Sequence, residues 1–140
     1  MHLIGIHFEE QRISSPVLDA LMAQDYQLQI NTSQSFSYPE LDHTVFVNVP
    51  KENMQELNKN PETWKRDEQN ITDIIKFINN RNTQRPFFNF MFFEATHAPY
   101  EFPETDIIRE DYVKEMNYAR LNLTNGIDQI KNRYINAAHY

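Results

Sequence analysis

The strongest structural signal in the sequence is an aromatic run at residues 87–93. Pro86 is followed there by Phe-Phe-Asn-Phe-Met-Phe-Phe, which has the length of a strand and is almost continuously apolar. A run of this kind is typical of a strand that is covered on both faces, as strands are in the middle of a parallel sheet. We therefore expect a central parallel strand at this position.

A helix and a strand are predicted in the first part of the chain. Ser15 can cap a helix that begins at Pro16, and apolar residues recur at helical spacing as far as about Gln24. Residues 26–32 then alternate between apolar and polar side chains, which is the period of a strand with one buried face. This strand should end near Thr32.

The segment between this strand and the aromatic run is predicted to contain one clear helix. From Asp67 to about Asn80 the apolar side chains recur at helical spacing, which indicates a stripe that faces the core. Residues 45–49 suggest a short strand, and residues 51–65 suggest irregular or short helical structure. The stripe consists of Ile71, Ile74, Ile75 and Ile78.

The order of these elements predicts the fold class. Alternating helices and strands favour right-handed crossovers onto one sheet, so we expect an α/β fold with a partial parallel β-sheet flanked by helices. In such sheets the binding and catalytic groups gather at the carboxyl ends of the strands. The loop that begins at Glu94 is expected to lie at that edge.

The last part of the chain is predicted to be helical. One helix is expected around 112–121, and a second is expected to follow a cap at Asn125. We divide the chain into a lead-in at 1–14, an α/β core at 15–103 and a helical tail at 104–140. We expect it to be the central fragment of a larger domain, truncated on both sides. The apolar residues of the last helix are Ile127, Ile130, Tyr134 and Ala138.

Composition and charge exclude several classes of function. The formal net charge is -7 and the sequence pI is about 5.1, so nucleic acid, whose phosphates would be repelled, is not an expected partner. The chain has no Cys, and its two Gly residues are too few for a loop that cradles nucleotide phosphates. No apolar run approaches the roughly 20 residues that a membrane-spanning helix needs.

The candidate functional residues directly follow the aromatic run, in the segment Thr96-His97-Ala98-Pro99-Tyr100. A histidine at the mouth of a parallel sheet can present an imidazole N–H to an anionic oxygen, or exchange a proton with it. The hydroxyl of Thr96 could add a second contact. The alternative is an ordinary loop histidine that is hydrogen-bonded to backbone, and spacing by itself does not separate the two.

Two motifs resemble a known family. Arg85-Pro86-Phe87-Phe88 and the Thr96–Tyr100 loop resemble the Pro-Phe-Phe strand and the Thr-His-x-Pro-Tyr loop of sulfatases, in the alkaline phosphatase superfamily. The resemblance implies an alkaline-phosphatase-like domain that acts on a sulfate or phosphate ester. It also implies that His97 contacts the ester oxygens, while Thr96 is a candidate substrate-binding residue from its position beside it.

Further segments resemble the sulfatase-like periplasmic domains of bacterial inner-membrane proteins of the YejM type. This likeness implies a location at the periplasmic face of the inner membrane, attachment through segments absent from this chain, and an anionic ester or lipid headgroup as partner. It leaves open a non-catalytic, lipid-sensing regulatory role, and an independent interaction domain is a third alternative. The segments are Ser15–Leu18, Phe36–Asp42 and Arg133–Tyr140.

The chain departs from the sulfatase pattern in its catalytic groups. Family members use a formylglycine made from Cys or Ser, or a Thr in the phosphotransferases, together with acidic metal ligands and a late Asp-His pair. Asp42-His43 imitates that pair, but it precedes the His97 loop, and Thr44 stands where Gly is usual. We therefore expect no catalytic residue and no metal site in this chain, and a divalent metal ion elsewhere in the protein.

Overall fold

The computed structural model describes residues 13–38, 40–59, 62–117 and 126–140. Most of the predicted lead-in at 1–14 therefore lies outside the described residues. In chain order the elements are α1 (Pro16–Ala23), β1 (Gln27–Thr32), the 3-10 helix η2 (Lys51–Asn53), β2 (Met54–Glu56), α2 (Thr63–Asn80), β3 (Phe87–Phe92), the 3-10 helix η3 (Glu104–Asp106) and α3 (Ile127–His139).

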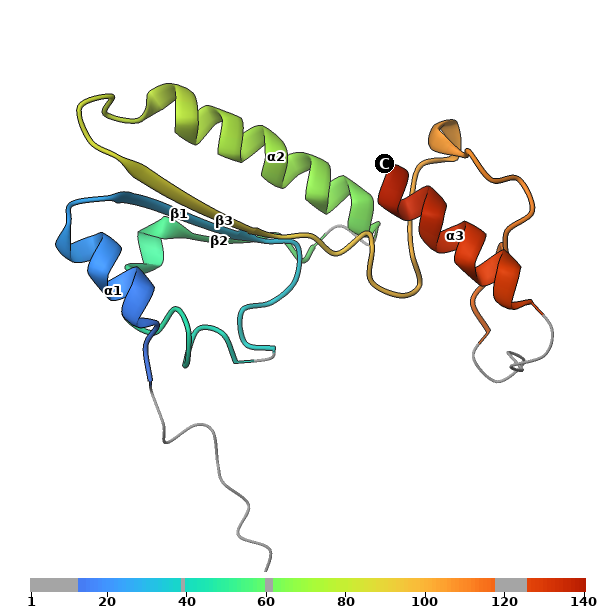
Figure 1. The fold of residues 1–140 in the computed structure, drawn as a ribbon, viewed down its shortest axis with the longest axis horizontal. Helices are drawn as coiled ribbons and strands as arrows, with labels where there is room; N and C mark the ends of the chain where they lie inside the picture. The colour runs from blue at the N-terminus through green and yellow to red at the C-terminus, as the bar shows by residue number, and fades with distance from the viewer. Residues whose placement is uncertain (1–12, 39, 60–61, 118–125) are drawn as a thin grey trace, which may run out of the picture.

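The strands form one parallel sheet in the order β2-β1-β3, with α1 on one side and α2 on the other (Figure 1). Alternate residues of β1 explain the two layers, because successive side chains of a strand point to opposite faces. Leu28 and Ile30 pack in the core with Leu18 of α1, whereas Asn31 bonds to Asn70 of α2. The predicted α/β fold with a parallel sheet between helices is confirmed.

The core lies between the sheet, α1 and the long connection that follows β1. Phe46 of that connection packs against Phe36 and Phe90, with ring centroids 5.7 and 5.2 Å apart. Full burial of one large apolar side chain stabilises a fold by about 1.5–3 kcal/mol, so these rings are a major contribution. The buried members of the core are Leu18, Leu28, Ile30, Phe36, Phe46 and Val49.

The predictions for the first helix and strand are confirmed. Helix α1 begins at Pro16, and the backbone N–H of Leu18 donates to the hydroxyl of Ser15 at 3.5 Å, which caps the helix. Strand β1 ends at Thr32 as expected. The prediction of a single buried face is wrong at its carboxyl end, because Asn31 and Thr32 are as buried as Ile30. Helix α2 covers the polar face there.

The aromatic run forms a parallel strand, but its predicted central place is wrong. Strand β1 is in the middle, and β3 pairs along one edge with it, residue for residue from Gln27 opposite Phe87 to Thr32 opposite Phe92. No other described strand pairs with β3, and its side chains are half-buried or exposed. Apolar density therefore does not distinguish an edge strand from a central one when its neighbours are unknown.

A second strand lies where none was predicted. Residues 45–49 form turns, from which Phe46 and Val49 reach the core. The strand β2 follows at Met54–Glu56, within the segment predicted to be irregular or helical. Strand β2 pairs in parallel with the carboxyl half of β1. With three residues it is too short to show an alternating pattern in the sequence.

Helix α2 is confirmed, but the face that it buries differs from the prediction. It begins at Thr63, four residues before Asp67, and its buried residues are all polar. The isoleucine stripe is partly solvent-exposed, with Ile71 at 40% and Ile75 at 52%. The reason is that the inward face meets the polar side of β1, so hydrogen bonds replace apolar packing. The buried residues are Thr63, Arg66, Asp67 and Asn70.

The tail holds one of the two predicted helices. Residues 112–117 are not helical, and the rest of the helix predicted at 112–121 lies outside the described part of the chain, as does the predicted cap Asn125. Helix α3 begins at Ile127, and its N-cap position is Gly126, whose φ of 90° suits a glycine. Among the described helices, none has the length and apolar character to cross a membrane.

Candidate functional site

The parallel register brings the ends of all three strands to one edge of the sheet. Thr32, the last residue of β1, lies opposite Glu56 of β2 on one side and Phe92 of β3 on the other, and each of these is also the last residue of its strand. The three following loops therefore leave from the same edge. The loop that begins at Glu94 lies at this edge, as the sequence predicted, and parallel α/β sheets commonly carry their functional groups there.

A layer of polar side chains fills the space between this edge and α2. The Asn31 side-chain amide donates to Asn70 Oδ1 at 3.1 Å, and Asn70 Nδ2 donates to Ser33 Oγ at 3.0 Å. All three residues are completely buried. Hydrogen bonds among buried polar groups fix one relative position of helix and strand, because any shift leaves a group unsatisfied.

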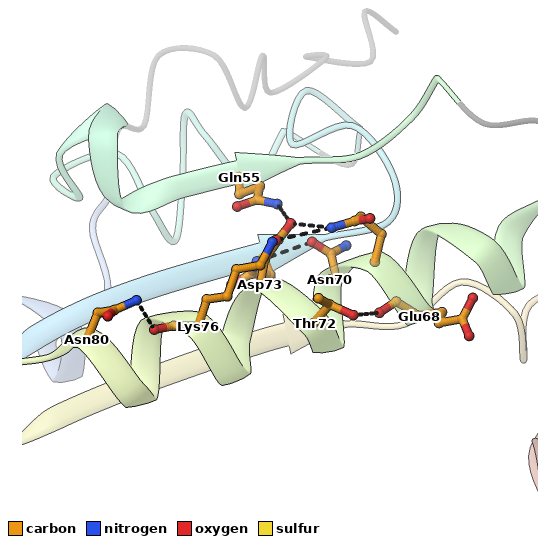
Figure 2. A network of polar contacts seen from close by, with 9 residues as sticks. Gln55, Glu68, Asn70, Thr72, Asp73, Lys76 and Asn80 are labelled. Atoms are coloured by element: carbon orange, nitrogen blue, oxygen red, sulfur yellow. Dashed lines mark hydrogen bonds and ion pairs between the residues drawn. The ribbon is translucent and has the colours of Figure 1, made fainter.

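A more exposed set of contacts continues this layer along α2 toward β2 (Figure 2). Gln55 of β2 donates to Asp73 of α2 at 2.5 Å, and Lys76 and Gln69 donate to the same carboxylate. Burial acts to raise the pKa of Asp73, but these hydrogen bonds and the charge of Lys76 outweigh it and hold the pKa below its usual value. The carboxylate therefore stays ionised and ties the helix to the edge strand.

Asp67 anchors the loop that follows β3. Its carboxylate accepts hydrogen bonds from the backbone N–H groups of Glu94, at 3.0 and 3.2 Å, and of Ala95, at 2.8 Å. The side chain is only 4% exposed, so these bonds are made away from solvent. A buried carboxylate bonded to two consecutive amides fixes the backbone where the loop leaves the sheet.

The loop itself is a tight turn that is also held from α3. The N–H of His97 donates to the carbonyl of Glu94 at 2.9 Å, and the N–H of Tyr100 donates to the carbonyl of His97 at 2.7 Å. Arg133 of α3 donates through Nε to the carbonyl of Pro99 at 2.5 Å. The turn is therefore fixed at its start by Asp67 and at its end by Arg133.

The two predicted substrate-binding residues sit on this turn with exposed side chains. The His97 ring lies against Phe92, with centroids 5.1 Å apart. Thr96 lines a cavity of about 480 Å³ between α2, the turn and the end of α3, whereas His97 is not among the residues that line this cavity. The two side chains thus share a turn but not that cavity.

The sulfatase family model matches residues 9–140, which is most of the chain. The chain belongs to the sulfatase family. Comparisons with curated proteins and with solved structures gave no match. The motifs at 85–88 and 96–100 thus indicated the right superfamily, and the matched range includes the whole edge described above.

Within residues 13–38, 40–59, 62–117 and 126–140, the side chains do not fit a divalent metal ion. The described part of the chain contains no group of three or more His, Cys, Asp or Glu side chains arranged to hold one. Asp42 and His43 lie in the turns after β1, with 3.9 Å between Oδ2 and Nε2, and His43 is largely exposed. Two such groups are fewer than the several converging ligands that a divalent ion needs.

The two side chains that hold the turn were not singled out from the sequence. Asp67 was placed at the start of a helix, where an acidic residue is ordinary, and Arg133 was noted within the YejM-type likeness alone. Their roles depend on contacts 27 and 34 residues away in the chain, between Asp67 and Glu94 and between Arg133 and Pro99. Local patterns carry no signal for contacts of that separation.

Proposed function

We propose that this sulfatase-family chain supplies the ester-binding loop of a hydrolase or transferase that acts on a sulfate or phosphate ester. His97 and Thr96 contact the ester oxygens in this proposal. The observation that supports it most is the placement of an exposed imidazole at the carboxyl edge of the sheet, on a turn fixed from two sides. A fixed donor costs little reorganisation when it meets developing negative charge.

The chemistry assigned to these residues is electrostatic and needs no covalent step. An imidazole N–H and a threonine hydroxyl both donate hydrogen bonds to an anionic oxygen, and such bonds strengthen as charge builds up on it. The nucleophile and the divalent ion used by the family would come from residues other than those described. When bound, that ion would polarise the ester and activate the attacking group.

A second candidate is a regulatory module that binds an anionic lipid headgroup without turning it over. Its support is the likeness of three segments to YejM-type domains, together with the sulfatase family itself. In this version the protein acts at the periplasmic face of the bacterial inner membrane, and the same loop recognises the headgroup phosphate. The two candidates share the binding residues and differ in whether a bond is broken.

Replacing His97 with alanine in the full-length protein tests the main proposal. We expect kcat/KM for an aryl sulfate or aryl phosphate to fall about 100-fold, because one positioned donor to the ester oxygens is lost. His43→Ala, which removes another exposed imidazole, is the matched control and should leave turnover unchanged. Equal kinetics for His97→Ala and the wild type would remove His97 from the site.

The same variants separate the two candidates. A protein that hydrolyses neither ester, yet binds vesicles containing an anionic phospholipid in a way that His97→Ala abolishes, would support the regulatory role. Thr96→Val removes the hydroxyl while keeping the shape of the side chain, so it should weaken either activity by a smaller factor than His97→Ala.

A further inference from the structure

A second cleft opens at the same edge of the sheet, on the other side of α2. It has a volume of about 520 Å³ and lies between the end of β2 and the first two turns of α2. Three of the residues that line it are cationic, Lys59, Lys65 and Arg66, and two are acidic, Glu56 and Glu68. The lining is thus positively charged overall, although the whole chain carries a net charge of -7.

Arg66 is the unusual member of this lining. Its side chain is 9% exposed, and its Nε is buried without a hydrogen-bond partner in the described residues. None of the ion pairs formed within that part of the chain involves its guanidinium. A mostly buried guanidinium with an unpaired N–H is unfavourable, so an arrangement of this kind is expected where an anion binds.

The surroundings of Arg66 also favour an anion. The hydroxyl of Thr63, in the first turn of the 18-residue helix α2, is buried and has no partner within the described ranges. The free N–H groups of a helix N-terminus attract negative charge, and Glu101 already accepts one of them, from Thr63 at 2.7 Å.

Neither acidic residue of the cleft forms an ion pair with Arg66 among the described residues. The Glu56 carboxylate is engaged by the backbone N–H of Phe36 at 2.9 Å and by Ser35 Oγ at 3.1 Å. Glu68 is an exposed residue on the surface of α2. Lys65 pairs with Glu62, which leaves Arg66 as the buried cation of the cleft.

We propose that this cleft binds a tetrahedral oxyanion, a sulfate or phosphate group, with Arg66 as its main ligand. The planar guanidinium fork can bind two oxygens of such a group, and Lys59 supplies further positive charge at the rim, whereas the charge of Lys65 is already paired with Glu62. A guanidinium and an ammonium together can contact three or more oxygens, which suits a sulfate or phosphate group better than a carboxylate with two. The group is either a free ion or the charged end of a larger molecule.

This site is separate from the loop of His97. Neighbouring residues of a helix point about 100° apart, and Arg66 lines the cleft beside β2 while Asp67 turns toward the loop after β3. The cleft and the cavity that Thr96 lines share only Glu68 among their lining residues. The oxyanion proposal is therefore independent of the proposed ester-binding role of His97, and the two can be tested separately.

Calorimetric titration of the full chain with sodium sulfate tests this site, with sodium chloride at equal ionic strength as the background. We expect wild-type protein and Lys131→Met, which loses an exposed cation on α3, to bind sulfate equally. Arg66→Met should show no binding. Arg66→Lys should bind about tenfold more weakly, because the ammonium replaces a two-oxygen contact by a point charge.

Thermal unfolding separates ligand binding from a structural role. Without sulfate, Arg66→Met should melt at or above the wild-type temperature, because an unpaired buried cation has been removed. Sulfate should then raise the melting temperature of the wild type and not that of the variant. A lower melting temperature for Arg66→Met, with an unchanged response to sulfate, would overturn the proposal.

Three further measurements complete the test. The Arg66 Nε–H resonance of the wild type should shift on addition of sulfate. A resonance that stays in place contradicts the proposed role of Arg66, and this measurement needs no variant.

His97→Ala should keep the Arg66-dependent binding of sulfate, which separates this site from the proposed ester site. Phenyl phosphate and inorganic phosphate, compared at pH 8 where both carry close to two negative charges, distinguish the two sources. Equal affinity indicates the charged end of a larger molecule, and much weaker affinity of phenyl phosphate indicates a free ion. Acetate binding as tightly as sulfate would contradict tetrahedral selectivity.

Discussion

At the scale of single residues, Asp67 shows how one side chain can set the position of the candidate ester-binding loop. Its carboxylate is buried and bonded to two consecutive amides at the point where the chain leaves β3. His97 follows within three residues of the first of these amides, so its place depends on that anchor. Asp67 is a positioning residue, because it acts on the candidate site through the backbone.

Replacing Asp67 with asparagine should lower the free energy of unfolding by about 2 kcal/mol. The amide keeps the shape but loses the charge that strengthens both hydrogen bonds, and its NH₂ group meets the backbone donors. Urea unfolding measures this loss. Amide exchange at Glu94 and Ala95 should also become faster, whereas Asp128→Asn, an exposed change on α3, should alter neither quantity by as much. Unchanged exchange at both amides would show that the anchor is dispensable.

At the scale of elements, the sheet-facing side of α2 is polar, and this explains the main difference between the sequence prediction and the structure. Asn70 is completely buried and bonds to both Asn31 and Ser33. A helix that is fixed by hydrogen bonds can leave its isoleucines partly exposed, as Ile71 and Ile75 are. The orientation of α2 is thus determined by satisfaction of polar groups and not by its apolar stripe.

Asn70→Ala tests this role of the polar layer. The substitution leaves the Asn31 amide and the Ser33 hydroxyl buried without their partner, and each unsatisfied group costs about 1–3 kcal/mol. We expect unfolding in urea to show a loss of about 3 kcal/mol. Asn79→Ala, at an exposed position of the same helix, is the matched control and should change stability by less than about 0.5 kcal/mol. Similar values for the two variants would refute the structural importance of the layer.

The elements that were predictable are those whose own residues carry the signal. Ser15 and Pro16 mark the start of α1, and the aromatic run at 87–93 marks β3. What could not be predicted depends on partners from elsewhere in the chain. Strand β2 exists because it pairs with β1, and the central place of β1 depends on which strands flank it.

The features of the candidate site also fall into those with a local sequence signal and those that depend on distant parts of the chain. The Thr96-His97 motif and its place after a parallel strand were readable from local sequence and from the family resemblance. The contact of Asp67 with the loop and the unpaired state of Arg66 are properties of the folded chain. A sequence pattern indicates which residues are present at an edge, but not which of them lack a partner.

At the scale of the whole molecule, the end of α3 approaches the start of α2 and links the tail to the α/β core (Figure 1). The Tyr140 hydroxyl donates to the carbonyl of Trp64 at 3.4 Å, and the two rings meet edge to face at 5.8 Å. Tyr140 also lines the cavity that Thr96 borders. This contact therefore closes one side of the candidate site.

The ionisation of Tyr140 should open this contact at alkaline pH. Burial, followed by the charges of Glu68, Asp67 and Asp106, raises the pKa of the Tyr140 phenol. A pKa that is higher in the folded state favours the neutral phenol there, so the stabilising effect is complete below the unfolded value of about 10. It is lost as the pH rises through the folded value, where a phenolate would be repelled by these three carboxylates.

Trp64 is the single tryptophan of the chain and reports this transition directly. We expect its fluorescence to change as the pH rises above about 10 in the wild type, and not in Tyr140→Phe, which keeps the ring but cannot ionise. Tyr38→Phe, which alters a tyrosine that is 83% exposed, should titrate like the wild type. An identical alkaline transition in Tyr140→Phe would mean that other groups cause it, because Lys residues titrate over the same range, and would contradict the role of the Tyr140 phenol. If Tyr38→Phe keeps the transition and Tyr140→Phe loses it, the closure of the cavity beside Thr96 depends on one phenol at the end of α3.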